Sequence, residues 1–245
     1  MSDIYAIGDI HGRADLLEAL LGHIAAIQRA GSSQPVIMFL GDLIDRGPRS
    51  PEVLDLVSSA LDRYPGSRLI LGNHDHYLRS LLRDELAEDD ATNWMDWGGV
   101  ATVSAYSRQP VPNFTGIATE IRERFPHHIG LLNGAVTHEV AGSFCFVHAG
   151  VRPGVPLAAQ TDYDLRWIRA GFLDHVEQFD HIVVHGHTIT NSLWPEIYQN
   201  RIALDTAAYR TGRLSAAVIR HDRLSHFLCT GIAANGGISV EEWMS

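Results

Sequence analysis

The segment GDLIDRG at residues 41–47 decides the fold class, because it directly follows the apolar run VIMFL at residues 36–40. A short apolar run that ends in a glycine and a carboxylate is typical of a buried strand that gives way to a sharp loop. Residues 51–64 come next and carry their apolar side chains at helical spacing. The stretch therefore predicts a strand, a polar loop and a helix, in that order.

Two further segments repeat this pattern. An apolar run at residues 4–7 ends in a Gly-Asp pair and precedes a predicted helix at 14–29, and a run at 69–71 ends in a Gly-Asn pair before one at 76–86. The intervening sequences do not match one another, so we interpret the segments as successive βα units of a buried sheet and not as solenoid repeats. Ligands bind at the carboxyl ends of strands in such sheets, where we expect the polar residues to meet.

The chain changes character at about residues 88–130, where tryptophan, glycine and proline are frequent. We expect an irregular, partly helical insert over the sheet edge that shapes a substrate cleft.

After the insert, strand patterns return and form a second, largely antiparallel set at 135–140, 143–147, 182–184, 201–204, 214–220 and 224–228. The sequence thus predicts an α/β fold of two sheets flanked by helices, in a single domain over residues 1–245.

The composition of the chain limits the classes of partner that we expect it to bind. The formal net charge of -10 argues against nonspecific binding to a nucleic acid polymer or an anionic membrane, although bound metal ions can still attract an anionic substrate. The two cysteines form no C-x-x-C motif, so a thiolate zinc site is not expected. With no signal peptide and no apolar run of membrane-spanning length, we expect a cytoplasmic protein.

Five short polar motifs follow apolar runs and supply carboxylates, imidazoles and an amide oxygen. Such a mixed set of oxygen and nitrogen ligands suits Mn²⁺, Fe or Zn²⁺ better than Mg²⁺ or Ca²⁺. Each motif alone is a weak signal, but five together indicate a metal site. The motifs are GDIHG at 8–12, GDLIDRG at 41–47, GNHD at 72–75, HAG at 148–150 and GHT at 186–188.

These motifs, in this order, resemble those of the calcineurin-like metallophosphoesterases. Within that group the chain is similar to the phosphoprotein phosphatase family in its short bacterial and phage form, over roughly residues 3–220. The second motif is the most specific because it carries both Asp45 and Arg46. The resemblance implies a β-sandwich of two mixed sheets with helices outside, and a centre of two divalent metal ions, with Mn favoured and Fe or Zn as alternatives.

The resemblance also implies metal ligands. Asp9 and His11 would bind the first ion, and Asp42 would bridge both ions. Asn73, His148 and His187 would bind the second ion. His185 lies two residues before His187 and is interpreted as a neighbour of the ligands, because Ile189 replaces the second histidine of the G-H-x-H pattern of some relatives.

Further roles follow from the same resemblance. His74 would act as the general acid toward the leaving oxygen, and Asp45 would orient it. Arg46 and Arg169 would clamp the phosphate, while the role of Arg166 stays open. Hydrolysis would proceed by direct attack of metal-activated water on phosphorus, with a phosphoprotein or a small phosphoester as substrate.

Three functions remain open. Asp45 and Arg169 favour a serine/threonine protein phosphatase, whereas Asp75 is typical of symmetrical dinucleoside tetraphosphate hydrolases. A non-catalytic metal-binding protein that docks a partner is disfavoured, because the acid and the arginines are present. Trp94 and Trp97 could form an aromatic wall for a peptide or a base, but we favour a hydrophobic cluster that anchors the insert.

Overall fold

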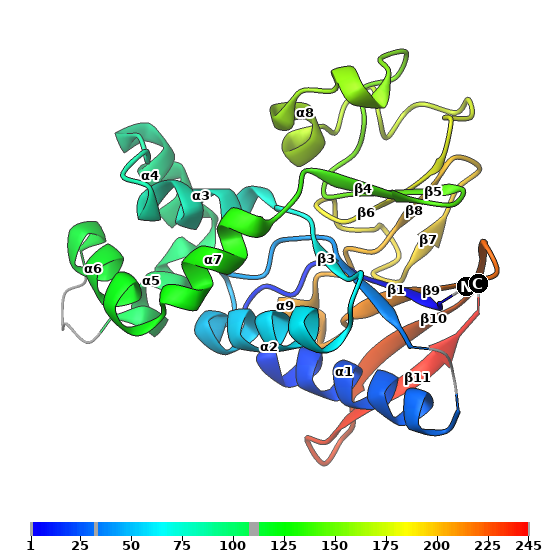
Figure 1. The fold of residues 1–245 in the computed structure, drawn as a ribbon, viewed down its shortest axis with the longest axis horizontal. Coiled ribbons are helices and arrows are strands. Elements are labelled where there is room, and N and C mark those ends of the chain that lie inside the picture. Colours follow the sequence, from blue (N-terminus) through cyan, green and yellow to red (C-terminus); the bar gives the residue numbers. More distant parts are fainter. Residues whose placement is uncertain (1, 32–33, 108–112, 245) are drawn as a thin grey trace.

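The computed structural model describes residues 2–31, 34–107 and 113–244 and arranges them as two β-sheets that face each other, with helices outside (Figure 1). The first sheet has the order β11-β10-β9-β1-β2-β3. Neighbours β1, β2 and β3 are parallel, and the remaining pairs are antiparallel. Its strands are β1 (Ile4–Ile7), β2 (Val36–Phe39), β3 (Arg68–Leu69), β9 (Ser215–Arg220), β10 (Arg223–Ile232) and β11 (Ile238–Trp243).

The second sheet has the order β4-β5-β6-β8-β7 and is also mixed. Strands β5, β6 and β8 run parallel, and β4 and β7 are antiparallel edge strands. Strands β4 and β5 form an antiparallel hairpin that turns around residues 141–142. The strands are β4 (His138–Ala141), β5 (Phe144–Val147), β6 (Ile182–His185), β7 (Glu196–Ile197) and β8 (Arg201–Ala203). Two mixed sheets flanked by helices confirm the predicted fold class.

The prediction that residues 214–228 belong to the second sheet is wrong. Strand β9 pairs with β1 in the first sheet, so that Ile4 lies opposite Ile219 and Ile7 opposite Ala216. The reason is packing: β9 is buried on both faces, as a central strand must be. A run of apolar residues shows that a strand is buried but does not identify its partner.

Side chains alternate between two cores along the first sheet. Tyr5 and Ile7 of β1 face the helices, whereas Ala6 faces the second sheet. Helices α1 (Ala14–Arg29) and α2 (Ser50–Arg63) cover the outer face, as predicted. The other helical segments are α3 (Asn73–Leu82), α4 (Glu88–Trp94), η1 (Met95–Gly99), α5 (Val100–Tyr106), α6 (Phe114–Arg124), α7 (Pro126–Gly134), η2 (Leu157–Ala159), α8 (Asp162–Trp167) and α9 (Ala208–Thr211).

The insert at 88–130 is more regular than expected. Its described part consists mainly of α4, η1, α5, α6 and the first residues of α7, which lie together at one end of the molecule in Figure 1; residues 108–112 lie outside the described part. Trp94 and Val103 belong to the same buried cluster as Leu16 and Phe39. This shared core supports our proposal that residues 1–245 form one domain.

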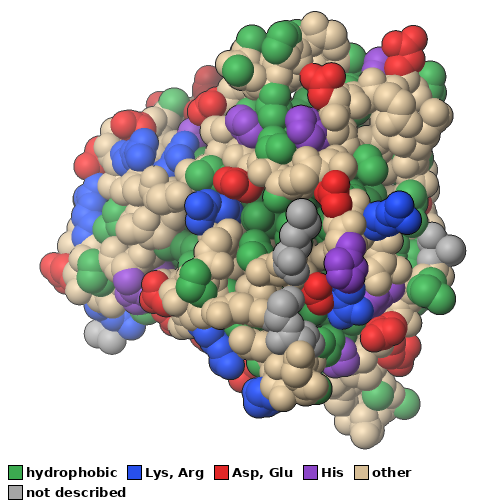
Figure 2. Space-filling model, turned by 45° about the vertical axis from the view of Figure 1, so that its right-hand side comes forward, with side chains coloured by type: hydrophobic (Ala, Val, Ile, Leu, Met, Phe, Trp, Pro, Cys, Tyr) green, Lys and Arg blue, Asp and Glu red, His purple; other side chains and the backbone are tan. Residues whose placement is uncertain are grey.

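In the described ranges, no helix is long and apolar enough to cross a membrane. On the face shown in Figure 2, acidic, basic and hydrophobic side chains are interspersed. The net charge of -10 is therefore not gathered into one acidic patch on that face.

Candidate functional site

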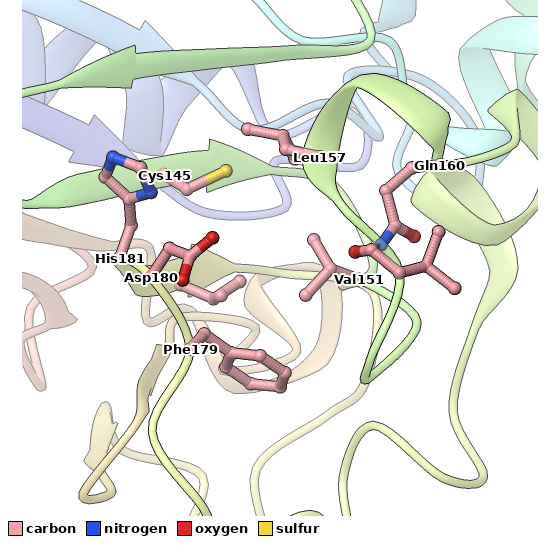
Figure 3. A pocket seen from close by; sticks show the side chains of 9 residues that line it. Cys145, Val151, Leu157, Gln160, Phe179, Asp180 and His181 are labelled. Atoms are coloured by element: carbon pink, nitrogen blue, oxygen red, sulfur yellow. Dashed lines mark hydrogen bonds between the residues drawn. The ribbon is translucent and has the colours of Figure 1, made fainter.

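A small, mostly apolar cavity of about 80 Å³ lies on the face of the second sheet that points away from the first (Figure 3). Val151 and Phe179 line it together with Cys145. Burial raises the pKa of the Cys145 thiol to about 12, so the thiol stays protonated near neutral pH and is a poor nucleophile. Gln160, Asp180 and His181 also line the cavity, and none of its lining residues belongs to the five motifs.

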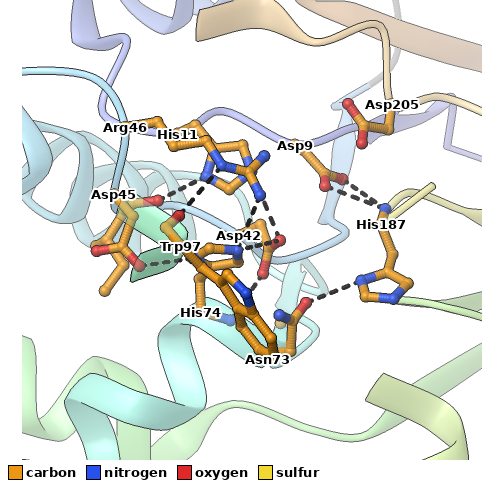
Figure 4. Close-up of polar contacts among 12 residues, drawn as sticks. Asp9, His11, Asp42, Asp45, Arg46, Asn73, His74, Trp97, His187 and Asp205 are labelled. Atoms are coloured by element: carbon orange, nitrogen blue, oxygen red, sulfur yellow. Dashed lines mark hydrogen bonds and ion pairs between the residues drawn. The ribbon is translucent and has the colours of Figure 1, made fainter. Parts of the chain in front are cut away.

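The predicted polar residues gather elsewhere, at the carboxyl ends of the central strands (Figure 4). Loops after β1 and β2, the first turn of α3, and the ends of β5 and β6 each contribute. The predicted ligands Asp9, His11, Asp42, Asn73, His148 and His187 are all buried. The topology therefore brings five motifs, separated by up to about 180 residues of sequence, to one place.

The backbone of this site is unusual. Non-glycine residues with a left-handed φ are uncommon, and such strain concentrates at functional sites. The site contains five of them: His11 (46°), Asp42 (52°), Asp45 (74°), Arg46 (65°) and His187 (64°). The loops are thus held in conformations that aim side chains inward.

Helix α3 begins at Asn73, not at His76 as predicted. The cause is Asp75, whose carboxylate accepts hydrogen bonds from the backbone N–H groups of Gly72 (3.1 Å) and Leu43 (2.9 Å). Burial and the nearby Asp42 raise the pKa of Asp75 to about 7. Because these printed bonds go to backbone, Asp75 ties two motif loops together and bears only indirectly on substrate choice.

One group of possible metal ligands consists of His11, Asp42 and His74. The Nδ1–H of His11 donates to the carbonyl oxygen of Ile44 at 2.7 Å, which leaves Nε2 as an unprotonated acceptor. This nitrogen lies 3.6 Å from Oδ2 of Asp42. Burial, reinforced by His74, holds the pKa of His11 well below its ordinary value, so the neutral ligand form is favoured.

A second group consists of Asp42, His148 and His187. His148 donates from Nδ1 to the carbonyl of Leu40 at 2.7 Å, so its Nε2 carries a lone pair. That lone pair faces two further acceptors, Oδ1 of Asn73 at 2.9 Å and Oδ1 of Asp42 at 3.3 Å. Nδ1 of His187 also lies 2.9 Å from the Asn73 oxygen. Converging lone pairs repel unless a cation lies among them, so this donor set fits a divalent metal.

Asp42 belongs to both groups. Its two oxygens face opposite sets of imidazoles, Oδ1 toward His148 and Oδ2 toward His11 and His74. Burial alone would raise the pKa of Asp42, but the surrounding histidines outweigh burial and the net shift is strongly downward. A carboxylate that stays ionised between two ligand groups is suited to bridge two ions.

Asp9 lies differently from its predicted partners. Both of its carboxylate oxygens accept from the backbone N–H of His187, at 3.1 and 3.0 Å. Burial, with the charges of Asp205 and Asp42, raises the pKa of Asp9 well above its ordinary value. Three buried carboxylates at one place are costly unless a cation neutralises them.

Asp205 was missed by the sequence reasoning. It is fully buried, and its Oδ1 accepts from the N–H of Ala207 at 2.9 Å. Its Oδ2 has no hydrogen-bond partner among the described residues, and the Asp205 side chain lies near Asp9 in Figure 4. A signal was present, because residues 201–204 are another strand that ends in a carboxylate.

His74 and Asp45 form the contact that the resemblance implied. Nδ1–H of His74 donates to Oδ2 of Asp45 at 2.6 Å, which leaves Nε2 on the side of Arg46. Burial lowers the pKa of His74, but Asp42 and Asp45 outweigh it and the net shift is upward. Asp45 also accepts from Trp94 Nε1 at 2.8 Å and Thr102 Oγ1 at 2.6 Å, two contacts from the insert that spacing could not reveal.

The arginines occupy three distinct positions. Arg46 donates to Nε2 of His11 at 2.8 Å and to Nε2 of His74 at 3.1 Å, and its guanidinium lies 5.0 Å from the ring centre of Tyr209. Arg169 is exposed. Burial is the main cause of the lowered pKa of His187, and the positive charge of Arg169 lowers that pKa further. Arg166 is buried and donates to Asp162 at 3.4 Å. Arg46 is thus the cation that contacts both imidazoles of the first ligand group.

His185 is fully buried beside the ring of Phe172 and lies outside both ligand groups. Its Nδ1 contacts the carbonyl of Gly186 at 3.0 Å. Burial lowers the pKa of His185 to about 4, so the imidazole is neutral. We therefore keep the interpretation of His185 as a neighbour of the ligands as a proposal.

Comparisons with known proteins agree with this chemistry. A 106-residue segment is 37% identical to the symmetrical bis(5'-nucleosyl)-tetraphosphatase of Delftia acidovorans and covers 38% of this chain and 35% of that protein. A 150-residue segment is 30% identical to the protein of the same name from Methylococcus capsulatus and covers 61% and 44%. The matched segments thus span less than half of these relatives.

The fold also matches a solved structure, that of the cold-active protein-tyrosine phosphatase of a psychrophilic Shewanella species. Its TM-score is 0.55 at 16% identity, with 100% of this chain and 81% of that chain covered. At family level, residues 2–194 match the family described as calcineurin-like phosphoesterase. The chain therefore belongs to the calcineurin-like phosphoesterase family.

Proposed function

We propose that this chain is a two-metal phosphoesterase that hydrolyses dinucleoside tetraphosphates. The observation that carries the reaction class is the pair of ligand groups that share Asp42, with Arg46 between His11 and His74. The substrate class is supported by the curated relatives, both of which are symmetrical bis(5'-nucleosyl)-tetraphosphatases. The sequence alone favoured a protein phosphatase, and the relatives favour the alternative.

The donor set allots ligands to two ions. One ion would be held by His11 and Asp42 with the nearby Asp9, and the other by Asp42, Asn73, His148 and His187. Mixed nitrogen and oxygen donors suit Mn²⁺, Fe or Zn²⁺. When bound, such a pair of ions polarises phosphoryl oxygens and lowers the pKa of water at the site.

The chain's own residues supply positioning, charge and a proton. Arg46 presents a planar fork of N–H donors that matches two phosphate oxygens, once substrate displaces its contacts to His11 and His74. Asp45 holds His74 in one tautomer, so that a protonated His74 can donate from Nε2 to the leaving oxygen. Arg169, at the exposed rim, adds positive charge near His187.

A second candidate is dephosphorylation of phosphoserine or phosphothreonine. The 2.6 Å contact between His74 and Asp45 favours it, because an alkoxide leaving group needs a proton far more than a nucleotide does. Both candidates use the same residues at the reacting phosphorus. The two substrates differ in the group attached to the reacting phosphate, which is a nucleotide in one and a peptide side chain in the other.

A substrate panel at fixed Mn²⁺ tests the proposal. Metal-stripped protein reloaded with Mn²⁺ should hydrolyse diadenosine tetraphosphate with a higher kcat/KM than phosphoserine, phosphothreonine or phosphotyrosine peptides. The reverse order would replace the proposed substrate by a phosphoprotein. Full turnover of para-nitrophenyl phosphate by the metal-stripped protein would refute the two-metal reaction itself.

A further inference from the structure

Four aromatic side chains from three separate segments meet beside the site. Tyr77 comes from α3, Trp97 from η1, and Tyr163 and Trp167 from α8. The ring centres of Trp97 and Trp167 lie 5.3 Å apart, those of Tyr77 and Trp97 6.1 Å, and those of Tyr163 and Trp167 6.2 Å. These four residues are called the aromatic wall below.

The wall is not a simple packing cluster. Trp94, three residues before Trp97, is fully buried and fits the expected role of an anchor for the insert. Trp97 is 42% exposed and Tyr163 is 68% exposed, although both belong to continuous ring contacts. Large aromatic surfaces that stay open to water beside a catalytic cleft are typical of ligand contacts.

The wall is continuous with the reacting centre. The ring of Trp167 lies edge-on to the ring of His187, with centres 6.1 Å apart. On the other side, the backbone N–H of Arg46 donates to the carbonyl of Gly98 at 3.1 Å, one residue after Trp97. A ligand whose phosphate lies at Arg46 and His187 therefore has aromatic faces within reach of its next group.

We infer that Trp97 and Tyr163 are the exposed faces of a nucleobase-stacking platform, with Tyr77 and Trp167 as its support. The inference rests on the proposed function, since it identifies what recognises the nucleoside of a dinucleoside polyphosphate. Stacking on aromatic side chains accepts any base, because every base has a π face. The platform would thus bind nucleosides with little preference for the base and would add nothing to the binding of inorganic polyphosphate.

The test separates nucleoside binding from phosphate binding. Inhibition of para-nitrophenyl phosphate hydrolysis is measured with ADP and with pyrophosphate at the same free Mn²⁺ concentration. The ratio of the two inhibition constants gives the advantage that the nucleoside confers. In Trp97→Ala this advantage should fall by about 10- to 100-fold, the loss expected for one stacking contact, and Trp97→Phe, which keeps a ring, should retain most of it.

Tyr163→Ala and Tyr163→Phe form a second matched pair at a more exposed position. This pair tests the platform if Trp97→Ala does not fold. GDP in place of ADP should give the same pattern. A wild-type protein that binds ADP no better than pyrophosphate, or alanine variants that keep the full ADP advantage, would overturn the platform. The two proposals can also fail separately. If the alanine variants lose the ADP advantage but the wild-type protein does not hydrolyse diadenosine tetraphosphate, the platform stands and the proposed function is rejected.

Discussion

The indole Nε1–H of Trp94 donates a 2.8 Å hydrogen bond to Oδ2 of Asp45, the same oxygen that accepts from Nδ1 of His74. Trp94 belongs to the insert, so the insert holds the partner of the proposed general acid. Trp94→Phe keeps an aromatic ring and removes a hydrogen bond to a charged group, worth about 1.5–3 kcal/mol. We expect the rate on an alkyl phosphate to fall roughly tenfold, with a smaller loss on para-nitrophenyl phosphate, because only the alkoxide depends strongly on the proton.

The control is Trp243→Phe, the same change on β11. Its kcat should match that of the wild type on both esters. An equal loss on the two esters in Trp94→Phe would mean that Trp94 acts only on stability and not through Asp45 and His74.

Asp42 gives a prediction about metal content. Asp42→Asn removes the charge shared by the two ligand groups, so both ions should bind more weakly. After dialysis against micromolar Mn²⁺, elemental analysis should find a clear loss of metal per chain relative to wild type and to Asp89→Asn, an exposed control on α4. Two retained ions in Asp42→Asn would remove the bridging role.

The sequence predicted the local units well because their signals are local. Apolar runs that end in Gly-polar pairs indicated β1, β2 and the helices after them, and the order of βα units placed the motifs at one edge. Strand partners depend instead on packing between distant segments. Strand β11 was not predicted at all. Its residues are only partly buried or exposed and include two glutamates, so it has no apolar run, as is common for an edge strand.

The site residues also fall into those that the sequence could predict and those that it could not. Residues inside a motif could be found by spacing, whereas Trp94 and Thr102 reach Asp45 from the insert by hydrogen bonds that no periodicity encodes. The two tryptophans of the insert also proved unlike, with Trp94 buried and Trp97 42% exposed. Only the folded structure distinguishes the buried Trp94, which anchors the insert, from Trp97, whose ring is partly open to solvent.

Asp205 provides a prediction that separates charge from architecture. Asp205→Asn keeps an acceptor for the N–H of Ala207 but removes one of three neighbouring buried carboxylates. The metal-free variant should melt at the same temperature as the wild type or higher, because like-charge repulsion is relieved. The rise in Tm on adding Mn²⁺ should shrink, because that rise reports metal affinity.

Thermal melts with and without Mn²⁺ measure both effects. Asp89→Asn, the same change at an exposed position on α4, is the control, and its Mn²⁺-dependent rise in Tm should equal that of the wild type. A lower Tm of metal-free Asp205→Asn together with an unchanged Mn²⁺ effect would make Asp205 a purely structural residue.

A second polar cluster, away from the site, links α2 to α7. Asp55 accepts from Nε2 of His127 at 2.6 Å and from Nε2 of the buried His128 at 3.0 Å, and Nδ1 of His128 contacts the hydroxyl of Tyr106 at 2.7 Å. Partial burial would raise the pKa of Asp55, but the two histidine hydrogen bonds outweigh it and the net shift is downward. Burial lowers the pKa of His128. Ionised Asp55 beside neutral His128 is therefore the favoured state.

The sign of the pH dependence follows. A carboxylate whose pKa is lowered by folding stabilises the protein above its unfolded pKa of about 3.9, and this contribution is lost as pH falls through the folded value. Asp55→Ala leaves the buried Nε2–H of His128 without its acceptor, which should cost about 1–3 kcal/mol at pH 7. The difference in unfolding free energy from wild type, measured by urea titration, should be full at pH 7 and shrink below about pH 4. Asp62→Ala, an exposed position on the same helix, should show no such difference, and a gap that stays constant down to pH 3 would exclude the Asp55–histidine contacts as its cause.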